Sequence, residues 1–339
     1  MISFPNVLCS YAYCYNSKQM TSTLCKLTSE ANTRLLIDSG AYTAFKLGKP
    51  VVLQNYIDYI KLLNAHGGAW NTIQLDVIGD SEKTKRNLDT MYEQGVKPMP
   101  VLTVDMKSSE SLNLIEYNKY ICIAGGQKFW QGAKDWQWRR TLDVDKFTKG
   151  KALSHFLAFV RIPDLYKLPI NSADASTWLA GQQYSRIACY ISGGRMTGGT
   201  FYHKLRHLPK NKLNKDLIRH LNKDKITKTQ WQDRELMSVG AGSYCSFKIV
   251  ASFVALCNDA RKRGKRIFLV VSGCGDLSTL ASVCMNSDDK GYLNWAKAKK
   301  MFFELKALRK KSQTDWESMI VSIINKLNQG IEIENTNSS

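Results

Sequence analysis

Long apolar runs are missing from this sequence of 339 residues. No uninterrupted apolar stretch approaches the roughly 18 residues that a membrane-spanning helix needs. The first residues, MISFPNVLCSYAYCYN, also lack the charged start and the long apolar core of a signal peptide. We therefore expect no membrane partner and a protein that works in the cytoplasm.

Glycine-rich nucleotide-binding loops are missing as well. No Gly-x-Gly-x-x-Gly opens a helix after the first apolar run, which counts against a dinucleotide-binding sheet, and there is no Walker loop. The nine cysteines include no Cys-x2-Cys pair, and their odd number and scattered positions indicate reduced thiols that mostly fill the core. We expect no cofactor, although folding could still bring cysteines together with His203, His207 or His220 to bind zinc.

Acidic residues are few compared with basic ones. Asp and Glu number 29 against 48 Lys and Arg, which gives a formal net charge of +19. Such an excess favours a polyanionic partner, with nucleic acid as the leading candidate and a membrane surface as the competing explanation. The hydrophobic content of 44% is enough for a substantial core and excludes a disordered chain.

Short apolar, β-branched runs alternate with amphipathic helical patterns such as LQNYIDYIKLLNAHG and SEKTKRNLDTMYEQG. The runs lie at residues 34–38, 72–79, 98–104, 120–126, 155–162, 186–194 and 266–273. With the first segment, FPNVLCSYAY, they give about eight candidate strands, the number in a TIM-type (β/α)8 barrel. We therefore expect one α/β barrel domain over residues 1–339, with a C-terminal helical region and a disordered tail at 330–339. An open doubly wound sheet is the alternative.

A strongly basic segment follows the run at 186–194. Between His203 and Arg234, ten Lys or Arg stand against three Asp, and apolar residues are too sparse for a core element. We interpret residues 200–240 as a basic insertion that binds nucleic acid, although a charge run can also be only a solvated face. The candidate nucleic-acid contacts are Lys204, Arg206, Lys210, Lys212, Arg195 of the GGRMTGG turn, and Trp130 of the basic stretch 128–140. The tryptophans of that stretch can stack an extruded base, or they can simply cover a barrel helix.

Carboxylates and glycines stand where several of the predicted strands end. They are Asp38 after RLLI, followed by Ser39 and Gly40; Asp76 and Asp80 in QLDVIGD; Gly125 and Gly126 in CIAGG; and Asp174 in NSADASTW. In a barrel the C-terminal ends of all strands meet on one face, so these residues should converge. Convergent carboxylates suit glycosyl transfer, in which one attacks the anomeric carbon and another handles the proton of the leaving group. Any one of them taken alone can instead cap the following helix.

Four stretches resemble, in order, motifs of the tRNA-guanine transglycosylases and, more closely, of their DNA-acting DpdA-type relatives in phages and bacteria. DSGAY resembles Asp-Ser-Gly-Gly-Phe, QLDVIGD resembles LDVIGD, YICIAGG resembles the I-A-L-G-G strand, and ADASTW resembles V-D-S-T-S-W. The likeness covers roughly residues 30–180. The zinc-ligand spacing of the tRNA enzymes is missing, Ala41 replaces their second Gly, and Ala175 stands where the family has Ser.

The resemblance implies a barrel enzyme that exchanges guanine in DNA for a free 7-deazaguanine base, such as 7-cyano-7-deazaguanine, after base flipping. It makes Asp174 the nucleophile and Asp38 the general acid/base. It places Asp76, Asp80, Ser39, Gly40, Gly125 and Gly126 in the base-binding site. The same exchange on tRNA and a non-catalytic nucleic-acid-binding barrel are the alternatives. The sequence leaves a homodimer or an accessory protein open.

Overall fold

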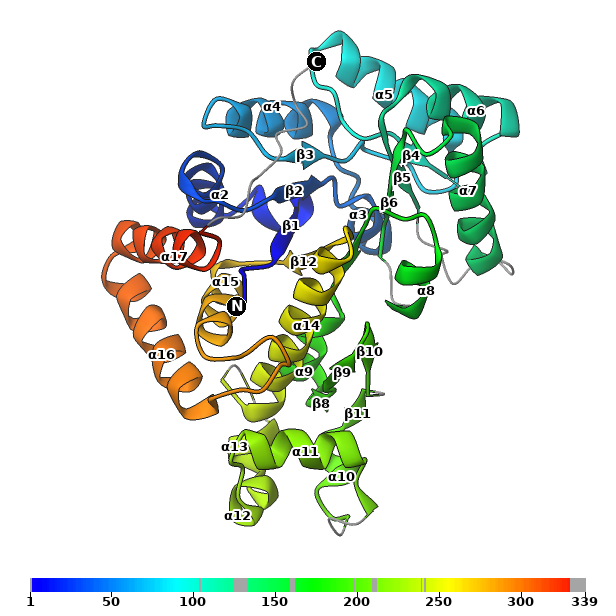
Figure 1. Ribbon diagram of the computed structural model, residues 1–339. Coiled ribbons are helices and arrows are strands. Elements are labelled where there is room, and N and C mark those ends of the chain that lie inside the picture. Colours follow the sequence, from blue (N-terminus) through cyan, green and yellow to red (C-terminus); the bar gives the residue numbers. More distant parts are fainter. Residues whose placement is uncertain are drawn as a thin grey trace.

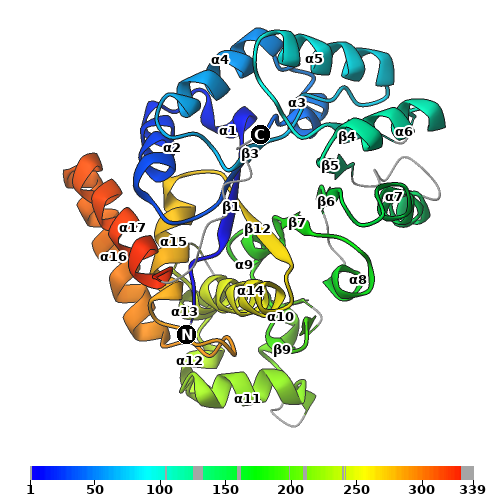
Figure 2. The same cartoon turned by 45° about the horizontal axis from the view of Figure 1, so that its top comes forward.

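The computed structural model describes residues 2–103, 105–124, 133–158, 162–197, 199–208, 212–238, 240 and 242–329. Its centre is an eight-stranded parallel sheet that curls on itself (Figures 1 and 2). The strands are β1 (Asn6–Ser10), β2 (Leu35–Asp38), β3 (Asn71–Thr72), β4 (Val101–Leu102), β5 (Tyr120–Ile123), β6 (Leu153–Phe156), β7 (Ser172–Ala175) and β12 (Arg266–Val271). Their order, β3-β2-β1-β12-β7-β6-β5-β4, is that of a TIM-type barrel.

The barrel is open between β3 and β4. Among the described residues, these two edges pair through an isolated bridge between Ile73 and Met99, in which the N–H of Met99 donates to the Thr72 carbonyl at 2.8 Å and the N–H of Gln74 donates to the Met99 carbonyl at 3.0 Å. The next ladder position is taken by a side chain, because the N–H of Val101 donates to Oε1 of Gln74 at 2.8 Å. The predicted α/β class with a curled parallel sheet of eight strands is confirmed, but the expected barrel stays open between these two edges.

Helices cover the outside of the curled sheet (Figure 2). They are α2 (Lys18–Glu30), α4 (Leu53–Asn64), α5 (Ser81–Glu93), α6 (Ser108–Tyr117), α7 (Ala133–Thr148), α8 (Ile162–Lys167), α14 (Tyr244–Lys262) and α15 (Cys274–Cys284). The two helical patterns singled out in the sequence are confirmed as α4 and α5. In α4, Tyr56, Ile57, Ile60 and Leu63 share the buried face, which is the spacing of an amphipathic helix. The expected C-terminal helical region consists of α16 (Trp295–Lys311) and α17 (Gln313–Leu327), whereas the predicted tail lies outside the described residues.

Alternate strand residues point to opposite sides of the sheet and form two separate apolar clusters. Val7 and Cys9 of β1 belong to the large cluster between sheet and helices, whereas Leu8 belongs to the smaller one. The smaller cluster contains Leu8, Leu36, Trp70, Ile73, Met99, Val101, Tyr120, Cys122 and Phe268, and we interpret it as the barrel interior. Polar side chains at the inward-facing positions beyond it therefore lie at the mouth, the carboxyl ends of the eight strands.

Two strand predictions are wrong in position. The run at 186–194 lies outside the barrel, where β8 (Arg186–Ile187) pairs with β11 (Thr200–Phe201) and β9 (Tyr190–Ser192) pairs with β10 (Arg195–Met196). The seventh barrel strand is instead β7, whose sequence SADA has no β-branched residue and therefore gives a weak strand signal. The run at 155–162 begins late, because β6 starts at Leu153.

The segment between β7 and β12 forms a layer of its own, set away from the sheet below α14 in Figure 1. Besides the two short hairpins it contains several short helices: η1 (Thr177–Leu179), α9 (Ala180–Tyr184), α10 (Tyr202–Leu205), α11 (Lys215–Lys223), α12 (Lys228–Gln232) and α13 (Arg234–Ser238). The expectation that its basic part contributes no core is wrong, since Leu217, Leu221 and Trp231 are buried.

A buried ion pair ties this layer to α14. Lys248 Nζ donates to Asp224 Oδ2 at 2.7 Å, and neither side chain is exposed. The hydroxyl of Tyr244 and the N–H of Leu293 also donate to Asp224, at 2.6 and 2.8 Å, while Lys248 donates to the carbonyl of Gly291. Each charged group therefore has the hydrogen-bond partners that burial of an ion pair demands.

Membrane insertion finds no support in the helices. Throughout the part of the chain that the structure describes, none combines the length and the apolar character needed to cross a bilayer.

Candidate active site

The mouth of the barrel brings Asp38 and Asp174 together. Asp38 ends β2, directly opposite Ser10 of β1, and Asp174 faces inward from β7. Cys122 lies inside the barrel below them. Burial, and next the negative charges of these two carboxylates and of Asp76, raise the pKa of its thiol. The three carboxylates therefore lie near one another, as their positions at strand ends predict.

A tight glycine turn holds Asp38 in place. The N–H of Gly40 donates to Asp38 Oδ2 at 3.0 Å, and the N–H of Ala41 faces the Ser39 hydroxyl at 3.3 Å. Gly40 has φ +78°, and a Cβ there would lie 2.4 Å from the Cβ of Ala12. Helix α3 (Ala41–Leu47) then starts with Gly40 as its N-cap and no side-chain cap, so Asp38 does not serve as the helix cap.

His155 lies beside Asp174 and is the residue that the sequence analysis missed. Its Nε2 is 3.3 Å from Asp174 Oδ1, and the same oxygen accepts the N–H of Ala158 at 2.9 Å. His155 is fully buried, and Asp174 is 7% exposed. The one sequence signal was a histidine at an inward-facing position of a strand, in a run that was otherwise apolar.

A chain of hydrogen bonds runs from His155 into the barrel. His155 Nδ1 lies 2.6 Å from the hydroxyl of Ser172, which lies 2.5 Å from the hydroxyl of Tyr120. With the ring hydrogen on Nε2, Nδ1 accepts from Ser172 and Ser172 accepts from Tyr120. Nε2 itself makes no hydrogen bond with the described residues, so the chain fixes the ring of His155 beside Asp174 without bonding to the carboxylate.

The two other carboxylates lie in less favourable surroundings for charge. Burial, and next the negative charge of Asp174, raise the pKa of Asp38 to about 6, although the Gly40 N–H opposes this shift. Asp76 follows β3 on a loop that α5 fixes through the bond from Asn87 to the Leu75 carbonyl at 2.9 Å. Burial, and next the charge of Asp38, raise the pKa of Asp76 to about 7. The mouth thus contains carboxyl groups that take up or release protons near neutral pH.

One predicted base-binding residue, Asp80, has a capping role in the structure. Asp80 is the N-cap of α5, where its Oδ1 accepts the N–H of Lys83 at 2.8 Å, so it fills the capping role that was the alternative for a strand-end carboxylate. Gly125 and Gly126 lie outside the described residues, as do Trp130 and Lys210.

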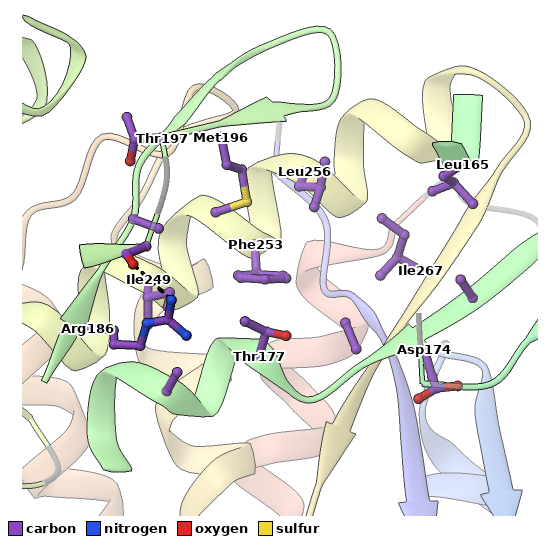
Figure 3. Close-up of a pocket in the computed structure, with 15 residues that line it drawn as sticks. Leu165, Asp174, Thr177, Arg186, Met196, Thr197, Ile249, Phe253, Leu256 and Ile267 are labelled. Atoms are coloured by element: carbon purple, nitrogen blue, oxygen red, sulfur yellow. Dashed lines mark hydrogen bonds between the residues drawn. The ribbon is translucent and has the colours of Figure 1, made fainter. Parts of the chain in front are cut away.

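A pocket of about 260 Å³ adjoins Asp174 on the outer side of β7 and β12 (Figure 3). Its walls are mainly apolar, with Phe253 and Leu256 from α14 and Met196 from the hairpin. Arg186 lies at the opposite end of the pocket from Asp174 and donates to the Gly199 carbonyl at 2.9 Å. The sequence analysis did not anticipate this pocket, because its walls come from segments far apart in the chain.

The predicted nucleic-acid contacts that the structure describes lie on the layer between β7 and β12. Lys204, Lys212 and Arg195 are exposed, and Arg206 is partly buried with its Nε donating to the ring of His207 at 2.9 Å. Three of these four cationic side chains are therefore exposed to solvent.

A zinc site would draw on the cysteines and the other potential metal ligands. Eight of the nine cysteines are buried and Cys25 is partly buried, which agrees with their expected place in the core. Within the described ranges, no group of three His, Cys, Asp or Glu side chains is arranged to hold a metal ion.

Comparison with known proteins adds no relative: no protein-family model and no curated protein matches this sequence.

Proposed function

We propose that this chain is a transglycosylase that exchanges guanine in DNA for a 7-deazaguanine base at the mouth of a TIM-type barrel. The observation that carries the proposal is the convergence of Asp38, Asp76 and Asp174 in three different environments. Glycosyl exchange needs one carboxylate that stays charged and one that exchanges a proton, and different environments separate these roles.

Asp174 is suited to be the nucleophile. The Ala158 N–H donates to its Oδ1, and a donor of this kind stabilises a negative charge, while His155 Nε2 lies 3.3 Å from the same oxygen. Among the described residues no hydrogen bond occupies its Oδ2, which is left to attack. Asp38 is suited to be the acid/base group, because a pKa of about 6 allows it to give and take a proton near neutral pH.

The reaction then balances over two steps. The Asp174 carboxylate forms a bond to the anomeric carbon as the bond from that carbon to N9 of guanine breaks, and protonated Asp38 gives its proton to the departing base. In the second step Asp38 takes the N9 proton of the incoming 7-deazaguanine. The freed nitrogen attacks the anomeric carbon and releases Asp174, so the enzyme returns to its starting state.

Asp76 is suited to hold the base. Its pKa of about 7 reflects a carboxylate crowded by burial and by Asp38. The ring N–H and exocyclic amine of a guanine edge offer two donors to such a carboxylate, which stabilises its charged form when the base binds.

The test is nucleoside mass spectrometry after incubation with 7-cyano-7-deazaguanine or its aminomethyl analogue. Duplex DNA, single-stranded DNA and tRNA serve as parallel substrates. We expect a deazaguanosine in DNA with the wild-type chain and none with Asp174→Asn, while Asp89→Asn, an exposed aspartate on α5, keeps full activity. Product in tRNA alone would mean that the substrate is tRNA and not DNA. Exchange by Asp174→Asn at the wild-type rate would mean that Asp174 is not the nucleophile.

Binding is tested separately, because a non-catalytic barrel would bind without turnover. Neutralising Lys204, Lys212 and Arg195 should reduce the salt dependence of DNA binding, by about one unit of slope for each phosphate that is no longer neutralised. An unchanged slope would remove the basic layer from the binding surface.

A further inference from the structure

Large exposed side chains gather on the loops that follow β1 and β2. Helix α1 (Tyr11–Cys14) comes directly after β1, and α3 comes two residues after Asp38. The exposed fractions are 50% for Tyr13, 47% for Tyr42 and 51% for Phe45. We call these three residues the aromatic rim. Because both helices follow the carboxyl ends of neighbouring strands, the rim borders the mouth.

Contacts between the two loops make the rim one continuous surface. The Thr43 hydroxyl donates to the hydroxyl of Tyr13 at 3.4 Å, which joins α3 to α1. The close approach of Gly40 to Ala12 holds the same two loops together beside Asp38. The two loops that carry the rings therefore contact each other beside the candidate active site.

The two loops themselves contribute only positive charge to the rim. Lys46 Nζ lies 5.0 Å from the centre of the Tyr42 ring, and Lys18, Lys46 and Lys49 are exposed. Residues 10–29 and 39–57 contain no Asp or Glu, and the nearby carboxylates of Asp38 and Asp58 come from the strand end and from α4. Aromatic rings beside exposed amines fit a ligand that combines planar rings with negative charge.

We propose that the aromatic rim stacks unpaired nucleotides that flank the nucleotide held in the mouth, which makes single-stranded nucleic acid its ligand. This inference rests on the proposed function for the identity of the central nucleotide, but not for the stacking itself. An anionic membrane also attracts rings and lysines, yet docking there would press the carboxylates of the mouth against lipid phosphates of the same sign.

The experiment measures binding of a fluorescein-labelled single strand of about 12 nucleotides by anisotropy, without any chemical step. We expect Phe45→Leu and Tyr13→Leu each to weaken binding about 5-fold to 100-fold, whereas Tyr13→Phe, which keeps the ring, binds as the wild type does. The control is Tyr117→Leu, since Tyr117 is 81% exposed at the end of α6, three residues before β5 begins at the amino end of the barrel.

The salt dependence separates stacking from charge. Stacking releases no counterions, so the rim variants should keep the wild-type slope, while Lys46→Gln should lower it by about one. Leucine variants that bind within about twofold of the wild type would overturn the proposal. So would rim variants that fail to bind phosphatidylserine vesicles while their binding to the single strand is unchanged. Base exchange plays no part in this readout, so failure of the rim and failure of the transglycosylase give different results.

Discussion

The negative charge of Asp76 at the mouth should lower the free energy of unfolding, and Asp76→Asn tests this directly. A carboxyl group whose pKa is raised on folding binds its proton more tightly in the folded than in the unfolded chain. Stability is therefore lost as the pH rises from the ordinary value of 3.8 to about 7, and the loss is complete above that. Asparagine imitates the protonated form and removes the penalty.

The size of the effect follows from the pKa. A rise from 3.8 to about 7 corresponds to about 4 kcal/mol, at about 1.4 kcal/mol for each pKa unit. Asp76 keeps part of its surface in contact with solvent, which screens the charge, so we expect about 2 kcal/mol. Asp76→Asn should then be more stable than the wild type by this amount at pH 8 and equally stable at pH 4.

Urea unfolding of both proteins at the two pH values measures the difference. The control is Asp80→Ala, which removes the N-cap of α5 and should destabilise the fold by about 1 kcal/mol at pH 8. The two substitutions thus have opposite signs although both remove an aspartate from one loop. If the Asp76→Asn protein is no more stable than the wild type at pH 8, the argument that burial raises the pKa of Asp76 is refuted.

Three further predictions concern single contacts. Asp174→Asn should lower the pKa of Asp38 from about 6, because the charge of Asp174 is the second cause of its rise; a carboxyl-carbon NMR titration that still gives about 6 would contradict this. Gly40→Ala should cost about 2 kcal/mol or more in urea unfolding, since φ is +78° and the new Cβ meets Ala12, and a cost below about 0.5 kcal/mol would count against that geometry. Lys248→Met should lower the free energy of unfolding by about 3–5 kcal/mol, because Asp224 stays buried without its ion-pair partner. The double variant with Asp224→Asn should be more stable than Lys248→Met alone. The opposite order would mean that the unpaired charge is not the cause of the loss.

The sequence predicts the parts of this structure in which local pattern and tertiary environment agree. The run RLLID predicts β2 and its terminal carboxylate, because three apolar residues before an Asp are what a buried strand and a polar mouth both require. The amphipathic spacing in α4 likewise matches the face that the helix buries. These local signals were sufficient to place Asp38 at the carboxyl end of a buried strand.

Other features depend on contacts that no local pattern contains. The sequence SADA of β7 has little strand propensity. It forms a strand because it pairs with β6 on one side and β12 on the other. The opening between β3 and β4 depends on the side chain of Gln74 reaching Val101, 27 residues away along the chain. The position of His155 beside a carboxylate depends on Ser172 and Asp174 of the neighbouring strand, so the histidine alone did not identify its partners.

The distribution of charge gives the proposed reaction a physical basis for selecting the base over its phosphates. The chain has a net charge of +19, yet the mouth contains three carboxylates, two of them with pKa values raised to about 6 and about 7. Phosphates are attracted to the exposed lysines around the barrel and repelled by the carboxylates of the mouth. A nucleobase has no charge and offers N–H donors, so it alone gains by entering. In the proposed reaction, the same field would hold the backbone outside and favour a base turned out of its stack.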